Sequence, residues 1–131
     1  MKRKAIPIKS SIDGKRSIAI DESNSKEILD FLNEKNLSKK FALICETILQ
    51  GLRNTDLYDK EDINGKCKQI TAMKFKGKQN ARLYCKELKS EDKVFIVIVS
   101  ELLEKKKSQK NQQKEIGLIE KVATYEYELY Q

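Results

Sequence analysis

The sequence predicts an α+β fold in a single domain spanning residues 1–131. Two patterns support this class: apolar residues recur at spacings of three and four between residues 22 and 52, and three later segments are rich in branched and aromatic residues. A chain of 131 residues with 39% hydrophobic residues can bury one modest core, which excludes a two-domain enzyme with a separate cofactor-binding half. The expected order is an N-terminal strand or hairpin, a helical hairpin, a three-stranded antiparallel meander and a C-terminal helix.

The N-terminal segment is predicted to form a short β-hairpin. Residues 4–9 and 16–20 alternate weakly in hydropathy on either side of Asp13-Gly14, a dipeptide typical of turns. Pro7 has no N–H group to donate, so its strand is expected at a sheet edge. Residues 1–20 therefore either add a strand to the sheet or form an arm.

Two short helices are expected next. The first has helix-capping residues at its start and ends near Asn36, and the second is predicted to begin at the cap Ser38 and to end between residues 51 and 54. The candidate caps of the first helix are Asp21, Ser23 and Ser25. The apolar stripes of the two helices contain Ile28, Leu29, Phe31, Leu32, Phe41, Ile44, Cys45, Ile48, Leu49 and Leu52.

The second half of the chain is predicted to be mainly β-structure. Residues 54–66 are acidic and turn-rich, so they are expected to form a loop. Three strands follow at residues 68–75, 81–88 and 94–103, and their short connectors favour antiparallel pairing. Because the third strand is apolar at nearly every position, we expect it at the centre of the sheet with both faces covered.

The chain is expected to end in a helix from about Gln112 to Glu128. Its apolar residues fall on one stripe that would pack against the sheet. They are Ile116, Ile119, Val122 and Ala123.

The composition excludes several kinds of chemistry. The chain contains no histidine, which removes Ser-His-Asp and Cys-His nucleophilic systems and histidine-ligated zinc. Cys45, Cys67 and Cys85 form an odd set with no CxxC pair, so we expect buried free thiols and a cytoplasmic protein. The longest apolar run is too short to span a membrane, and no metal-ligand cluster or cofactor motif is present.

The positive charge is concentrated in one part of the chain. The net charge is +7, and residues 66–110 contain 13 basic and 5 acidic side chains. That third of the protein is where a nucleic-acid backbone would be attracted, although a lysine-rich solvated surface would have the same composition.

The predicted turn at residues 77–79 places Lys74 directly opposite Arg82 on the neighbouring strand. Tyr84 and Lys86 would share their face, because side chains on one face of a strand recur every second residue. Like charges in a direct cross-strand pair cost stability, which favours an anion between them. Lysines that splay into solvent from an edge strand are the alternative.

A second basic cluster lies before the last helix. Its lysines are Lys105, Lys106, Lys107 and Lys110. Four lysines in six residues suit a phosphate-binding loop, since neighbouring ammonium groups lower one another's pKa, but they also suit a solvated charged loop.

Residues 70–116 resemble a known family. The matching segments are ITAMKF at 70–75, GKQNARLYC at 77–85, and KKSQK at 106–110 followed by Glu115-Ile116. With the order of predicted elements, they are similar to the RelE/ParE toxin superfamily and its phage-derived, HigB-like branch. The resemblance covers residues 22–126. The chain departs from the family pattern at Ala72, Glu104, Gln112 and Val122.

The resemblance implies a bacterial type II toxin that cleaves mRNA, often on the ribosome, and is held inactive by a cognate antitoxin. Arg82 matches the family's arginine at the scissile phosphate, and Lys74 stands where the family usually has arginine. Lys106, Lys107 and Lys110 match its basic loop.

We therefore expect a metal-independent endoribonuclease without a cofactor, and an antitoxin protein as partner. The candidate catalytic residues are Arg82, Lys74, Lys106 and Lys107. The candidate RNA-binding residues are Lys76, Lys78, Tyr84, Lys86, Lys105 and Lys110. A ParE-like toxin without nuclease activity and a noncatalytic nucleic-acid-binding module are the alternatives.

Overall fold

The computed structural model describes residues 2–106 and 113–128. Within these residues the chain forms one mixed seven-stranded sheet and three α-helices, which confirms the predicted α+β class. The strands are β1 (Arg3–Ser10), β2 (Arg16–Asp21), β3 (Tyr58–Lys60), β4 (Ile70–Phe75), β5 (Ala81–Lys89), β6 (Phe95–Leu103) and β7 (Tyr127–Glu128). The helices are α1 (Ser25–Glu34), α2 (Ser38–Leu49) and α3 (Gln113–Thr124).

The strands lie in the order β3-β4-β5-β6-β2-β1-β7. β4, β5 and β6 pair antiparallel in succession, and β2 pairs parallel to β6. β1 and β2 pair antiparallel, so the expected N-terminal hairpin is part of the sheet. Among the described residues, β7 pairs with β1 at Arg3 and Lys4, and no described strand pairs with this edge of β1 at Pro7, which has no N–H to donate.

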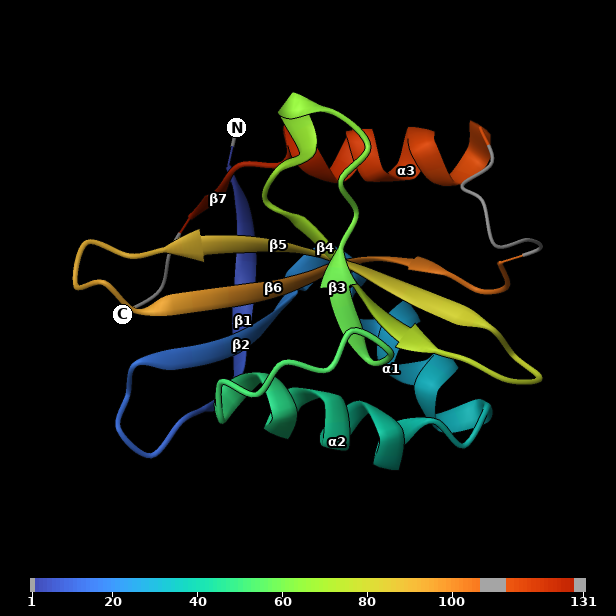
Figure 1. The fold of residues 1–131 in the computed structure, drawn as a ribbon, viewed down its shortest axis with the longest axis horizontal. Helices are drawn as coiled ribbons and strands as arrows, with labels where there is room; N and C mark the ends of the chain where they lie inside the picture. The colour runs from blue at the N-terminus through green and yellow to red at the C-terminus, as the bar shows by residue number, and fades with distance from the viewer. Residues whose placement is uncertain (1, 107–112, 129–131) are drawn as a thin grey trace.

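Helices cover both faces of the sheet (Figure 1). α1 and α2 lie on one side, here called the α1–α2 face, and α3 lies on the other, the α3 face. Val97 and Val99 of β6 belong to the core under α1 and α2, whereas Ile96 and Ile98 belong to the core under α3. The uninterrupted apolar run of β6 is thus explained by burial on both sides, as expected.

The turn between β4 and β5 determines the register of this strand pair. Gly77 has a φ of 109° and Asn80 a φ of 46°, values that suit glycine and asparagine in tight turns. Phe75 pairs with Ala81 and Lys74 with Arg82, so the predicted register is confirmed.

Several predicted boundaries differ from the structure: α2 ends at Leu49 and not between residues 51 and 54, and β4 begins at Ile70 and not at residue 68. Residues 54–66 are not entirely loop, because Tyr58–Lys60 pair with β4 as an edge strand. Three residues are too few to give a recognisable periodicity in sequence. The last helix ends at Thr124 and not at Glu128, because Tyr127 joins a strand and its hydroxyl bonds the distant Asp21 carboxylate at 2.7 Å.

The helix starts also differ in detail. Ser38 is the first residue of α2, and the cap position is taken by Leu37. The carboxylate of Asp21 accepts hydrogen bonds from the backbone N–H groups of Ser23 and Asn24, and so caps the short 3₁₀ turn that precedes α1.

All three cysteines are buried free thiols, as expected. Burial raises the pKa of the Cys45 thiol from 9.0 to about 12, which keeps it in its unreactive protonated form at neutral pH. In the part of the chain that the structure describes, no helix is long and apolar enough to cross a membrane.

Candidate functional site

The β4–β5 pair places two cations opposite each other on the α3 face. Lys74 and Arg82 are direct cross-strand partners, an arrangement that costs stability unless another group compensates for it. The Lys74 ammonium donates a hydrogen bond to the backbone carbonyl of Thr55 at 2.9 Å. Its positive charge is therefore held near the strand pair by an uncharged acceptor.

Arg82 is a buried cation with one unpaired donor. Its side chain is largely buried, with 7% of the residue's surface exposed. Nη1 donates at 3.3 Å to the side-chain oxygen of Asn80 and to the carbonyl of Ala81, while Nε has no hydrogen-bond partner among the described residues. No described carboxylate lies within ion-pair distance of the guanidinium. Buried donors are almost always paired, so this guanidinium is a strong candidate to bind an anion.

The hydroxyl of Tyr84 is a second unpaired polar group on the same face. Tyr84 is fully buried in the core that Ile119 and Val122 of α3 complete. The Tyr84 ring, a candidate RNA-binding group, is thus covered by α3 and packs in the core. Burial raises the pKa of the Tyr84 phenol, and the carboxylates of Glu61 and Glu115 add to the shift.

Lys106 lies beside this strand pair. Its backbone N–H donates to the carbonyl of Asn80 at 2.9 Å, and its carbonyl accepts from the Asn80 side-chain amide at 2.6 Å. These two bonds hold the chain after β6 against the β4–β5 turn. Burial lowers the pKa of the Lys106 ammonium; the charge of Glu61 opposes this shift and that of Arg82 adds to it.

Two acidic residues complete the site, and sequence reasoning did not select either of them. Glu115 is buried in the first turn of α3, and Glu61 follows β3. Both influence the pKa values of Tyr84 and Lys106, so both lie within electrostatic reach of them. We call this set the Arg82 cluster: Lys74, Arg82, Tyr84, Lys106, Glu61 and Glu115. The one sequence signal for either carboxylate was the Glu115-Ile116 dipeptide, which belongs to the segments that resemble the family; Glu61 had no such signal.

Lys86 shares the face of Arg82 but has a structural role. Its ammonium donates to the carbonyls of Ala123 and Tyr125 at 3.1 and 2.5 Å, at the C-terminal end of α3. A cation at this end of a helix satisfies the last carbonyls and opposes the helix dipole favourably. The expected contact of Lys86 with RNA is therefore replaced by a contact that holds α3 on the sheet.

Replacing Lys86 with methionine should lower the free energy of unfolding by about 2 kcal/mol, because two partly buried carbonyls lose a charged donor. RNA affinity should stay unchanged. Urea denaturation and fluorescence anisotropy with a labelled RNA measure the two quantities. Lys78→Met, at the exposed β4–β5 turn, is the matched control and should shift stability by less than about 0.5 kcal/mol. Unchanged stability with weakened RNA binding in Lys86→Met would contradict this assignment.

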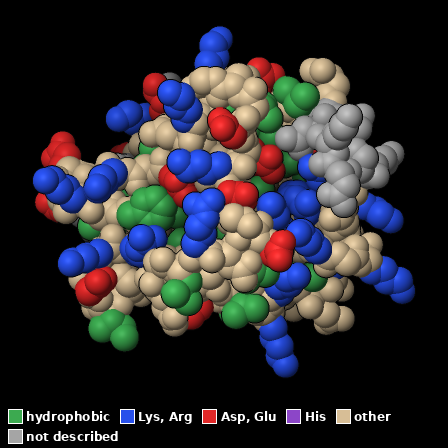
Figure 2. Space-filling view, viewed as in Figure 1, with side chains coloured by type: hydrophobic (Ala, Val, Ile, Leu, Met, Phe, Trp, Pro, Cys, Tyr) green, Lys and Arg blue, Asp and Glu red, His purple; other side chains and the backbone are tan. Residues whose placement is uncertain are grey.

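The other candidate lysines lie at the surface. Lys76 forms an ion pair with Asp56 at 2.9 Å, and Lys78 and Lys105 are exposed. Lys107 and Lys110 lie outside the described residues. Lys and Arg side chains gather to the right of centre in Figure 2, toward the end of the sheet where the β4–β5 turn lies in Figure 1.

Across the described residues, no group of three or more cysteine, aspartate and glutamate side chains is placed to hold a metal ion. No family model, curated protein or solved structure matches this chain.

Proposed function

We propose that this protein is the toxin of a type II toxin–antitoxin system, an endoribonuclease that cleaves mRNA and so inhibits translation. The observation that carries the proposal is the buried Arg82 guanidinium, with an unpaired Nε and with Lys74 directly opposite. A planar arginine can bind the nonbridging oxygens of a phosphate through parallel hydrogen bonds, and a second cation nearby adds to the attraction.

The proposal includes a RelE-like arrangement of the elements. Its support is that α1 and α2 cover one face, that β4, β5 and β6 pair antiparallel in succession, and that β2 lies parallel to β6. The candidate site lies on the opposite face, at the β4–β5 pair.

The proposed reaction is attack of a ribose 2′-hydroxyl on the adjacent phosphorus. The 2′-oxygen forms a bond to phosphorus as the bond to the 5′-oxygen breaks, leaving a 2′,3′-cyclic phosphate and a 5′-hydroxyl end. Arg82 stabilises the charge that develops on the nonbridging oxygens. Lys106, whose pKa is lowered by burial, accepts the proton of the 2′-hydroxyl in its neutral form. Lys74, in its charged form, donates the proton to the leaving 5′-oxygen.

Access to the site requires a local movement. Arg82 and Lys106 are each only 7% exposed, so a phosphate reaches the guanidinium when Lys106 moves away from Asn80. The contacts between Asn80 and Lys106 are two hydrogen bonds, which hydrogen bonds to RNA can replace.

A cognate antitoxin is the proposed partner. A short acidic or amphipathic segment of that protein would cover the basic surface around the Arg82 cluster and block RNA. The neighbouring reading frame is the place to look for it.

The test is induced expression in a bacterium, with mapping of mRNA ends, combined with incubation of the purified protein with a labelled RNA in the presence of a chelator. Rapid translation arrest and new 5′-hydroxyl ends are expected, and a single 2′-deoxy substitution at the cleaved position should block cleavage. Growth arrest with intact mRNA and a DNA damage response would instead indicate a ParE-like toxin. Salt-sensitive RNA binding without cleavage or growth arrest would indicate a noncatalytic module.

A further inference from the structure

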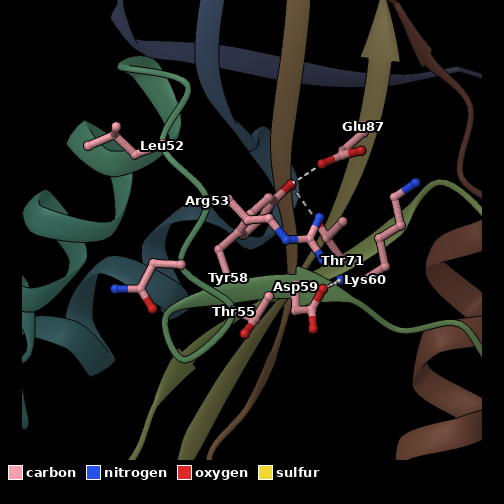
Figure 3. Close-up of a pocket in the computed structure, with 9 residues that line it drawn as sticks. Leu52, Arg53, Thr55, Tyr58, Asp59, Lys60, Thr71 and Glu87 are labelled. Carbon is pink, nitrogen blue, oxygen red and sulfur yellow. Dashed lines mark hydrogen bonds between the residues drawn. The ribbon is translucent and has the colours of Figure 1, made fainter.

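A small polar pocket lies at the β3 edge of the sheet, on the α1–α2 face (Figure 3). Its volume is about 190 Å³, which suits one planar ring system and is below the range of drug-sized ligand sites, about 300–1,000 Å³. Its charged and hydroxyl-bearing lining residues are Arg53, Thr55, Tyr58, Asp59, Lys60, Thr71 and Glu87. They come from the loop after α2 and from the strands β3, β4 and β5.

A hydrogen-bond relay fixes the acidic group of this pocket. The Thr71 hydroxyl donates to the Tyr58 oxygen at 2.7 Å, and the Tyr58 hydroxyl donates to Oε2 of Glu87 at 2.6 Å (Figure 3). Tyr58 is thereby satisfied as donor and as acceptor, and burial raises its pKa, so it remains a protonated donor. Oε1 of Glu87 accepts no hydrogen bond from any described side chain. The Glu87 carboxylate is therefore held in one orientation, and its Oε1 can accept hydrogen bonds from a ligand.

Two cations flank this carboxylate. Arg53, in the segment between α2 and β3, and Lys60, at the end of β3, both line the pocket (Figure 3). Neither side chain forms an ion pair or hydrogen bond with another described residue. The pocket thus combines a fixed acceptor with two cationic donors that suit a phosphate, beside a second carboxylate from Asp59. A nucleotide, which offers N–H donors on its base and an anionic phosphate, complements the Glu87 acceptor and the two cations.

The pocket also adjoins the Arg82 cluster. Thr55 lines the pocket, and its carbonyl is the group that accepts the hydrogen bond from Lys74 at 2.9 Å. An RNA strand that places a phosphate beside Lys74 can pass the short edge strand β3 and place a neighbouring base at Glu87.

We infer that this pocket binds a guanine base of the RNA substrate, with Glu87 as its specificity-determining residue. Guanine presents two adjacent N–H donors on its Watson–Crick edge, which match a carboxylate. Adenine and cytosine present one amino donor beside a ring-nitrogen acceptor, and uracil presents one N–H donor between two carbonyl acceptors. Each of these bases therefore offers a carboxylate only one donor, next to an acceptor that the carboxylate repels. Single-stranded RNA bases are read through such edges. The inference rests on the proposed RNA-cleaving function and adds a base preference to it.

The test measures nucleotide binding to the full-length protein by NMR, with 5′-GMP, 5′-IMP and 5′-AMP as probes. GMP should bind at least tenfold more tightly than AMP, and IMP, which lacks the 2-amino group, should bind about tenfold more weakly than GMP, the effect of one charge-assisted hydrogen bond. The amide signals of residues 53–60, 71 and 87 should shift on GMP binding.

Glu87→Gln is the decisive variant. The amide oxygen of glutamine can still accept the Tyr58 proton, so the fold is retained, while its NH₂ group faces the guanine donors. GMP affinity should fall at least tenfold and AMP affinity should not fall. Arg53→Ala should weaken GMP and AMP alike, because both carry the phosphate. Glu34→Gln, on the exposed surface of α1, is the matched control and should change neither.

Equal affinity for GMP and AMP, or GMP-induced shifts confined to other residues, would overturn the inference even if the protein cleaves RNA. A protein that binds GMP at this pocket and leaves RNA intact would instead contradict the proposed nuclease and leave guanine binding supported. The two ideas therefore fail separately.

Discussion

Replacing Arg82 with glutamine is expected to lower the rate of RNA cleavage about 100- to 1,000-fold, the usual cost of removing one donor that stabilises transition-state charge. Glutamine retains some length but cannot bind two phosphate oxygens through parallel charged donors. The measurement is single-turnover cleavage of a labelled RNA, supported by loss of growth arrest on induced expression.

The same variant should fold almost as well as the wild type. The Arg82 guanidinium is buried with Nε unpaired, so its removal relieves an unfavourable burial while it sacrifices some packing. We expect the free energy of unfolding to change by less than about 1 kcal/mol, as is common where a strained functional group is removed. Lys39→Gln, an exposed cation on α2, serves as the control and should leave cleavage unchanged. Cleavage at the wild-type rate by a folded Arg82→Gln protein would refute the proposed role.

Replacing Asp21 with alanine is expected to lower the free energy of unfolding by about 3 kcal/mol, because the change breaks a partly buried ion pair and leaves the buried Tyr127 hydroxyl without its carboxylate acceptor. Breaking a fully buried ion pair from one side typically costs about 3–5 kcal/mol. Asp21 is fully buried and accepts from Arg3 Nε at 2.6 Å and from the Tyr127 hydroxyl at 2.7 Å. It also caps the 3₁₀ turn before α1. One carboxylate thus joins β1, β2, β7 and the start of the helical layer.

Urea denaturation measures this effect, and Asp30→Ala is its control. Asp30 pairs with Lys26 at 2.6 Å on the exposed surface of α1, where an i,i+4 ion pair contributes only about 0.3–0.5 kcal/mol. The prediction for Asp21 fails if the two variants lose similar stability.

Much of the architecture was predictable because it depends on local patterns. The apolar spacing of α1 and α2, the Asp13-Gly14 turn of the first hairpin and the uninterrupted apolar run of β6 are all determined by neighbouring residues. The register that opposes Lys74 and Arg82 was also predictable, since the length and residues of one turn determine it.

The parts that sequence reasoning missed depend on long-range contacts. β3 is stabilised by pairing with the edge of β4. β7 is stabilised by the hydrogen bond from the Tyr127 hydroxyl to Asp21, which lies more than a hundred positions away in the sequence. Lys86 was predicted to bind RNA, whereas in the structure its ammonium donates to carbonyls at the C-terminal end of α3. Burial of Tyr84 likewise depends on where α3 packs.

The sequence by itself determined the fold class, the N-terminal hairpin, the free thiols and the cross-strand pair of cations. Periodicity, turn chemistry and composition act over a few residues and can be read directly from the order of the amino acids. Only the tertiary structure decided that Arg82 is buried with an unpaired Nε, which carboxylates lie near it, and that Glu87, Tyr58 and Thr71 line one pocket. Burial and charge pairing depend on residues that packing brings together across the whole chain, and therefore no local pattern reveals them.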